Sequence, residues 1–101
     1  MAVFVVTYRY TEGAADARAA VRPIHREFTG ALAEQGYNLA SGPVGADETP
    51  GAVFLVSAAD KAAALALLAD DPFQIEGLVA EVTAVEWQPV TGPLVPGFPA
   101  S

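Results

Sequence analysis

The segment from Val3 to Tyr10 constrains the fold more than any other part of the chain, because most of its residues are β-branched or aromatic. Alternate residues of a strand point to opposite faces of a sheet. One face would carry Val3, Val5 and Thr7, and the other Phe4, Val6 and Tyr8. Both sets are largely apolar, which indicates a central strand covered on both sides. The rest of the chain must therefore supply two covering layers.

The main helix is predicted from the position of a proline. Pro23 is tolerated best in the first turn of a helix, so this helix would begin near Val21 or Arg22 and run to Gln35, where Gly36 ends it. The apolar spacing predicts a buried stripe of Ile24, Phe28, Ala31 and Leu32, and leaves Arg22, Arg26 and Thr29 toward solvent. Residues 11–20 fit either a loop or a short helical lead-in.

The second half of the chain contains three more strand patterns and two helical ones. The strands are expected over 37–44, 52–57 and 79–87, with a turn over 45–51, a helix beginning after residue 60 and a short helix over 72–76. Gly42 and Pro43 break the first of these strands, which suits the edge of a sheet. Asp60 and Asp71 stand where N-caps are expected.

The resulting order is β-α-β-β-α-β, the split unit of a ferredoxin-like sandwich in the α+β class. It predicts an antiparallel four-stranded sheet with both long helices on one face. Two helices cover only one side, and the first strand is apolar on both. The simplest cover for the other side is a second copy of the same sheet, so the sequence predicts a homodimer that packs as a dimeric α/β-barrel.

The chain of 101 residues, 52% of them hydrophobic, has the size and composition of one domain. We expect that domain over residues 1–88 and a Pro/Gly-rich C-terminal arm over 89–101. The prolines of this arm stand at positions 89, 93, 96 and 99 and exclude a helix or a central strand. The arm is expected to be extended, and either lies against a partner subunit or hangs free.

The charge and the missing residue types exclude several functions. Twelve acidic residues against five basic ones give a net charge of −7, which argues against nucleic acid or an anionic membrane surface as a partner. No cysteine is present, so thiolate catalysis and disulfides are excluded. The sequence shows no metal-ligand pattern, phosphate-binding loop or dinucleotide fingerprint, so we expect no metal and no cofactor. The apolar N-terminus fits neither a signal peptide nor a spanning helix, so we expect a cytoplasmic protein.

His25 is the only histidine and the natural group for proton transfer near neutral pH. The stretch Asp70-Asp71-Pro72-Phe73 is expected to supply a carboxylate partner, although a role as a helix cap alone would explain Asp71. A helix N-terminus lowers the proton affinity of an imidazole, and a neighbouring carboxylate raises it. A lone histidine beside a buried stripe also fits a structural role, and Arg22 fits either a solvated charge or a substrate clamp. The aromatic residues of the strands fit a core as well as a pocket wall.

Three short motifs occur in order along the chain: Arg22-Pro23-Ile24-His25, Ala40-Ser41-Gly42-Pro43, and Asp71-Pro72-Phe73 followed by Gly77-Leu78-Val79. Together they resemble the YCII-related family of small bacterial proteins, from about Met1 to Trp87. The resemblance implies a ferredoxin-like fold, a dimeric α/β-barrel and an active site built on a His-Asp pair. That pair would be His25 and Asp71, and the substrate would contact Arg22, Ser41, Gly42, Pro43 and Phe73. A few relatives of this type are dehydrochlorinases of chlorinated aromatics, and others are joined to transcription regulators.

These observations lead to two function hypotheses. The first is a cofactor-independent acid-base enzyme of the lyase or isomerase type, which acts on a small aromatic or enolisable molecule through the His-Asp pair. General acid-base catalysis of this kind contributes roughly a hundred- to ten-thousandfold. The second is a non-catalytic ligand-binding or regulatory homodimer that uses the same pocket. A purely structural role would leave no pocket large enough for a ligand.

Overall fold

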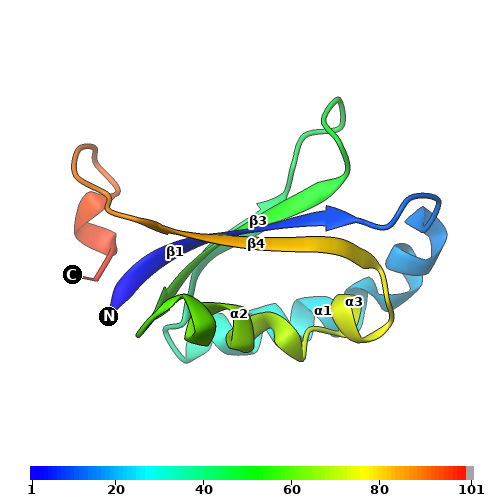
Figure 1. Cartoon of the computed structure of the whole chain (residues 1–101), viewed down its shortest axis with the longest axis horizontal. Helices are drawn as coiled ribbons and strands as arrows, with labels where there is room; N and C mark the ends of the chain where they lie inside the picture. Colours follow the sequence, from blue (N-terminus) through cyan, green and yellow to red (C-terminus); the bar gives the residue numbers. More distant parts are fainter. Residues whose placement is uncertain (100–101) are drawn as a thin grey trace.

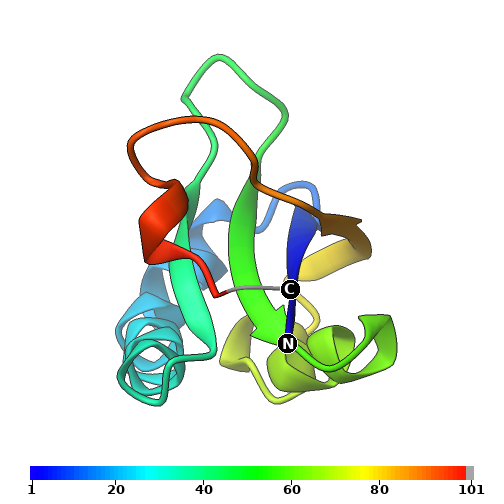
Figure 2. The same cartoon turned by 90° about the vertical axis from the view of Figure 1, so that its left-hand side faces the viewer.

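The computed structural model describes residues 1–99 and shows a single four-stranded antiparallel sheet with helices on one face (Figures 1 and 2). The elements in chain order are β1 (Ala2–Tyr10), α1 (Ala15–Glu34), β2 (Asn38–Pro43), β3 (Gly51–Ala58), α2 (Lys61–Ala69), α3 (Pro72–Ile75), β4 (Val79–Trp87) and η1, a short 3₁₀ helix (Val95–Gly97). The strand order is β2-β3-β1-β4, so β1 is central and β2 lies at an edge. The predicted α+β, ferredoxin-like arrangement is confirmed.

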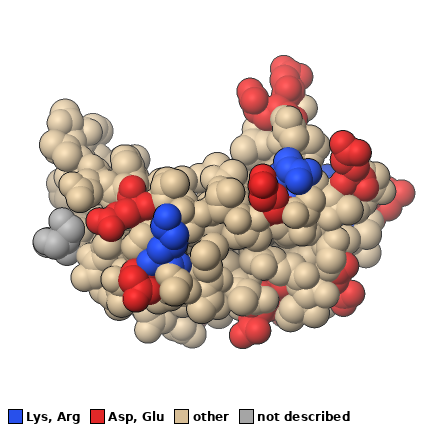
Figure 3. Space-filling view, in the orientation of Figure 1, with Lys and Arg blue, Asp and Glu red and all other residues tan. Residues whose placement is uncertain are grey.

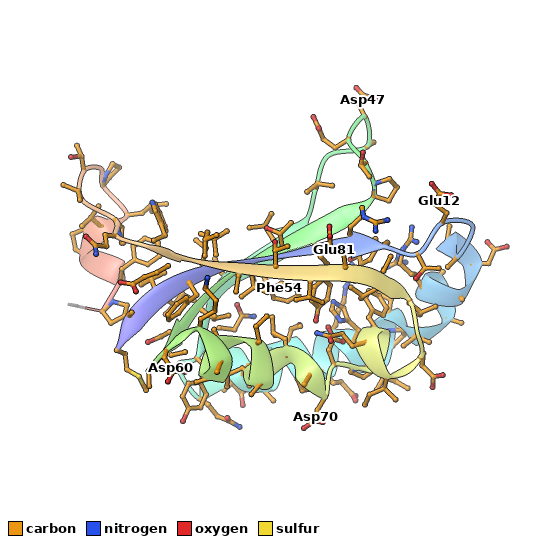
Figure 4. All side chains as sticks on the ribbon, viewed as in Figure 1. Glu12, Asp47, Phe54, Asp60, Asp70 and Glu81 are labelled. Atoms are coloured by element: carbon orange, nitrogen blue, oxygen red, sulfur yellow. The ribbon has the colours of Figure 1, made fainter. Side chains whose placement is uncertain are left out.

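The core lies between the sheet and the helices. Strand β1 contributes the side chains on one of its two faces, Phe4, Val6 and Tyr8, and all three are almost fully buried. Val6 faces Phe54 across the β1–β3 pair, and Figure 4 shows Phe54 in the layer between the sheet and the helices. From the helices, Leu32 of α1 and Leu68 of α2 complete the cluster. This packing fixes the face of the sheet on which a site can form.

Helix α1 begins at Ala15, six or seven residues before the expected start near Val21 or Arg22, so the predicted start was wrong and residues 15–20 form the helical lead-in that was the alternative to a loop. Pro23 lies inside the helix, where it removes one backbone hydrogen bond, a change that costs about 3 kcal/mol in a helix interior. The alanine-rich residues 14–20 favour helix strongly enough to extend it upstream of the proline. His25 consequently lies in the middle of a 20-residue helix, far from the positive end of its dipole.

The buried stripe of α1 is also rotated relative to the prediction. Leu32 is buried and Phe28 packs against the core as expected, but the Ile24 side chain is 57% exposed and Ala31 is exposed as well. His25 takes the inward position three residues before Phe28. The rotation also places the arginines that flank His25 along a cavity, which is described below.

The shorter elements match their predicted positions closely. Asp60 caps α2, where its Oδ1 accepts a hydrogen bond from the Ala63 amide at 2.8 Å, and the side chain of Asp71 caps α3. On β4, Val79 packs against the core, whereas Val85 lies on the opposite face of the sheet. The cause is a shift in the β1–β4 register next to Tyr10.

The prolines predicted an extended C-terminal arm, but the arm folds back onto its own chain. Figure 2 shows it crossing the sheet face opposite the helices, and η1 forms its only helical turn in the described residues. The Phe98 ring lies edge-on against Trp87, with 5.5 Å between ring centroids. The last two residues of the predicted arm, 100 and 101, lie outside the described part of the chain.

Beyond the arm, the sheet face opposite the helices is open and mainly apolar. Val85 is 55% exposed on this face and Trp87 41%, while Val5, Val53 and Leu55 are half-buried. Figure 3 shows a hollow between the arm and the β2–β3 turn, with charged side chains on its flanks and few within it. Among residues 1–99, no helix is long and apolar enough to cross a membrane.

Candidate functional site

The structure brings His25 and Asp71 into direct contact. The Nδ1 atom of His25 lies 2.7 Å from Oδ1 of Asp71, although the two residues are 46 positions apart in the chain. The Asp71 side chain is fully buried, and that of His25 is 13% exposed. The pair therefore combines a hidden carboxylate with an imidazole that still reaches solvent.

Asp71 reaches this position because it caps the short helix α3. Its Oδ1 accepts a hydrogen bond from the Phe73 amide at 3.0 Å, and Pro72 occupies the first helical position. Capping and contact with the histidine were compatible in principle, because a carboxylate has two oxygens with several acceptor sites. The structure shows that one carboxylate makes both contacts at once.

The second oxygen of Asp71 accepts a hydrogen bond from the Tyr8 hydroxyl at 2.7 Å. The Gln74 amide donates to the Tyr8 oxygen at 3.1 Å and to the Leu68 carbonyl at 2.8 Å, so the phenolic proton is directed at Asp71. Asp71 is thus the acceptor at the end of a chain of donors. Because an ionised carboxylate can only accept, we expect Nδ1 of His25 to carry the proton in the neutral ring and Nε2 to carry the lone pair.

Burial, the largest contribution, raises the pKa of Tyr8 far above its usual range, and the Asp71 hydrogen bond raises it further against an opposing contribution from Gln74. Burial also raises the pKa of Tyr10, with Arg18 and Arg22 opposing the shift and Asp71 reinforcing it. Both phenols stay neutral near pH 7. Tyr8 is therefore a hydrogen-bond donor in this site.

Aromatic rings hold the imidazole in place. The Phe73 ring stacks on His25 with 3.9 Å between centroids and an angle of 3° between planes, and Phe54 meets it edge-on at 6.5 Å. Phe73 is itself almost completely buried. Phe73 thus covers one face of the imidazole, and Asp71 binds its Nδ1 atom. No residue of the described part of the chain hydrogen-bonds the other ring nitrogen, Nε2.

His25 lies on the wall of a cavity of about 570 Å³. Helix α1 forms one wall, and β2 with the β2–β3 turn forms the opposite one. The predicted substrate contacts Arg22, Ser41, Gly42 and Pro43 all line this cavity, but Phe73 does not. The sequence did not point to Arg18 as a lining residue, and Arg26 and Thr29, which also line the cavity, had been expected toward solvent. Tyr10 is a strand aromatic that does form part of the cavity wall.

Asn38 links the edge strand β2 to α1 through a side-chain hydrogen bond. Its side-chain amide donates to the Thr29 carbonyl at 3.2 Å and to the Ser41 hydroxyl at 3.0 Å. The bond to Thr29 joins β2 to α1, and the bond to Ser41 lies within β2, next to the cavity lining. Within residues 1–99, no group of three or more acidic or histidine side chains is arranged to hold a metal ion.

A sequence model of the YCII-related domain matches residues 2–88. The chain belongs to the YCII-related family. No curated protein matches this YCII-related chain significantly.

Solved structures share the fold of this YCII-related protein. A 5-chloro-2-hydroxyhydroquinone dehydrochlorinase from Burkholderia phenoliruptrix AC1100, in complex with 2,5-dihydroxybenzoquinone, has a TM-score of 0.72 at 19% identity, over 85% of this chain and 93% of the other. An antibiotic biosynthesis monooxygenase has a TM-score of 0.56 at 21% identity, over 90% and 100% of the two chains. A NIPSNAP domain protein from Burkholderia xenovorans has a TM-score of 0.54 at 19% identity, over 89% and 95%. At these identities the likeness shows the fold alone.

Proposed function

We propose that the protein is a cofactor-independent acid-base enzyme of the lyase or isomerase type, and that it acts on a small aromatic or enolisable molecule. The observation that carries the proposal is the His25–Asp71 contact at the wall of the cavity, where no residue among 1–99 hydrogen-bonds Nε2 of the imidazole. This is the arrangement that a general base requires, with one nitrogen oriented by a carboxylate and the other available to substrate.

In the proposed reaction, Nε2 of His25 takes a proton from an acidic C–H or O–H of the substrate. Asp71, which accepts from Nδ1, stabilises the imidazolium that forms. In a lyase reaction the electron pair of the broken bond expels a leaving group from the neighbouring carbon, and the proton passes from the imidazolium to water. In an isomerase reaction the imidazolium returns the proton to another carbon of the same substrate.

The other site residues support this chemistry indirectly. Phe73 is buried against the imidazole, so we assign it the positioning of His25 in place of a substrate contact. Ser41, Gly42 and Pro43 would contact the substrate from the wall opposite α1. The structurally similar dehydrochlorinase removes chloride from a hydroxylated aromatic ring, a reaction of the type proposed here.

A substrate panel tests the proposal. The panel contains chlorinated hydroquinones, assayed by chloride release, and small 1,3-dicarbonyl compounds, assayed by solvent deuterium uptake in NMR spectra. We expect turnover with the native protein and a loss of about a hundredfold or more in His25→Gln. The control Lys61→Gln changes a cation at the start of α2, outside the cavity lining, and should leave turnover unchanged. Binding without any turnover would favour the ligand-binding hypothesis, and turnover that persists in His25→Gln would overturn the mechanism.

We also propose that the protein forms a homodimer through its open sheet face. We propose separately that it acts in the cytoplasm, which cell fractionation would check. The support is the apolar surface around Val85 and Trp87, which the described residues leave exposed. Light scattering should give twice the 10.4 kDa chain mass. Val85→Glu should reduce this mass to that of one chain, whereas Ile75→Glu, on exposed α3, should not. A native protein with the mass of one chain at micromolar concentration would refute the dimer.

A further inference from the structure

Basic residues are scarce in this protein, yet most of them gather at the cavity. The chain has five basic residues against twelve acidic ones. Three of the five, Arg18, Arg22 and Arg26, line the cavity beside His25, and its only acidic lining residue is Glu48. A protein with a net charge of −7 therefore surrounds its candidate base with positive charge.

The three arginines form a row on α1. They are spaced four residues apart, so they lie on one face of the helix, about 12 Å from first to last. Like charges at this spacing destabilise a helix, so the helix itself gains nothing from the row. We call Arg18, Arg22 and Arg26 the arginine row.

No carboxylate neutralises the arginine row within residues 1–99. The ion pairs of this part of the chain are Arg9 with Glu81, at 3.7 Å, and His25 with Asp71. Arg18 lies over the Tyr10 ring, 4.4 Å from its centroid, which orients one guanidinium at the cavity wall. Arg18 and Arg22 are half-buried, so their charges are only partly screened by water.

We propose that the substrate is a small carboxylic acid whose carboxylate binds the arginine row while its acidic carbon or hydroxyl group faces Nε2 of His25. The inference rests on the proposed function. A guanidinium binds a carboxylate through two parallel hydrogen bonds, which fixes the orientation of the ligand as well as its position. Arg22 stands three residues before His25, so it lies one helical turn from the base.

The same charge would assist the reaction. Removal of a proton by His25 leaves a new negative charge at the reacting group of the substrate, and a preorganised cation stabilises that charge more than it stabilises the uncharged C–H or O–H group of the ground state. Arg22, the middle member of the row, is placed to act on both the bound carboxylate and the developing charge. Arg18 and Arg26 then set how far along α1 the carboxylate is held.

Two probes of the same shape test the inference: benzoate, which carries a carboxylate, and benzamide, which is neutral. Each is titrated at constant ionic strength, and binding is followed by the ring resonances of the single histidine. We expect benzoate to bind at least about tenfold more tightly than benzamide. Arg22→Gln should weaken benzoate binding about tenfold and leave benzamide binding unchanged. Arg9→Gln, which removes a cation outside this cavity, should change neither.

The outcomes separate this inference from the proposed function. Equal affinities for the two probes, no benzoate binding at millimolar concentration, or equal effects of Arg9→Gln and Arg22→Gln would each overturn the carboxylate inference. His25→Gln should retain benzoate binding. Because this variant has no histidine resonances, its binding is measured by calorimetry. If benzoate binding depends on Arg22 but no substrate turns over, the inference stands and the enzyme proposal fails. If a neutral substrate turns over at the same rate in Arg22→Gln, the enzyme proposal stands and the inference fails.

Discussion

The Nδ1 atom of His25 lies 2.7 Å from Oδ1 of Asp71, and this contact joins the middle of α1 to the N-terminus of α3. Asp71 is fully buried, and two further donors, the Tyr8 hydroxyl and the Phe73 amide, also bind it. A buried carboxylate is stable only when such partners compensate for the loss of water. The contact therefore serves the fold as well as the proposed chemistry.

Asp71→Ala should lower the free energy of unfolding by about 3–5 kcal/mol, because it leaves three buried donors without an acceptor and removes the cap of α3. Asp71→Asn keeps one acceptor oxygen and should cost about 1–2 kcal/mol. Urea unfolding followed by Trp87 fluorescence measures both. Asp70→Ala is the matched control, since Asp70 is exposed at the outer side of the helices (Figure 4) and should change stability little. Equal costs at positions 70 and 71 would contradict the network.

Phe73→Leu should lower the free energy of unfolding by about 1–2 kcal/mol and should also release the imidazole. The stacked Phe73 ring shields the His25 ring protons, so their resonances should move downfield in the variant. Turnover should fall with little change in KM, because Phe73 lies outside the cavity lining. Phe98→Leu, in the C-terminal arm, is the control and should leave the His25 resonances in place. An unchanged His25 spectrum in Phe73→Leu would exclude a positioning role.

Gly51→Ala should be strongly destabilising, by at least about 2–3 kcal/mol, because a Cβ atom there would lie 2.1 Å from the Tyr8 carbonyl oxygen in the β1–β3 pair. Gly30→Ala should have the opposite sign and stabilise by about 1 kcal/mol, since Gly30 lies within α1 with open space around it. Thermal unfolding of both variants, with Gly45→Ala as a control in open space, measures the contrast. A neutral Gly51→Ala would mean that β1 and β3 pair differently at that end.

Stability should fall in alkaline solution because burial raises the pKa of Tyr8 and Tyr10. The folded state holds both protons more tightly than the unfolded chain. This contribution is fully present below the unfolded tyrosine pKa of about 10, and it is lost as pH rises above that value. Between its unfolded and folded pKa, Tyr8 contributes a slope of up to about 1.4 kcal/mol per pH unit, and the half-exposed Tyr10 contributes less. Unfolding experiments should show a smaller slope in Tyr8→Phe than in the native protein, and equal slopes would refute the burial effect.

The fold could be predicted from the sequence because local patterns determine most of it. A run of β-branched and aromatic residues identified β1, and Asp60 and Asp71 marked helix starts through short-range capping. The start of α1 was missed because the usual place of Pro23 in a first turn was weighted above the helix propensity of the alanines before it. A separate error placed Ile24 in the buried stripe where His25 lies, and so left Arg22 and Arg26 toward solvent.

The site was only partly predictable. His25 stood out as the single histidine, and Asp71 came from the family resemblance. The Tyr8 contact joins residues 63 positions apart, and only the packing of β1 on α3 brings them together. The arginine row did have a sequence signal, the i, i+4, i+8 spacing from Arg18 to Arg26. That spacing places the three side chains on one face of α1, but whether this face points to solvent or to the cavity depends on how the helix is rotated against the sheet.

The tautomer of the His25 ring is the most direct test of the proposed site. Long-range ¹H–¹⁵N correlation spectra of labelled protein distinguish the two ring nitrogens, and the single histidine makes the assignment unambiguous. With the ring neutral, we expect one tautomer with the proton on Nδ1, held by Asp71, and an unprotonated Nε2 toward the cavity. A proton on Nε2, or a mixture of tautomers that Asp71→Asn leaves unchanged, would contradict the proposal that Asp71 orients His25 as the base.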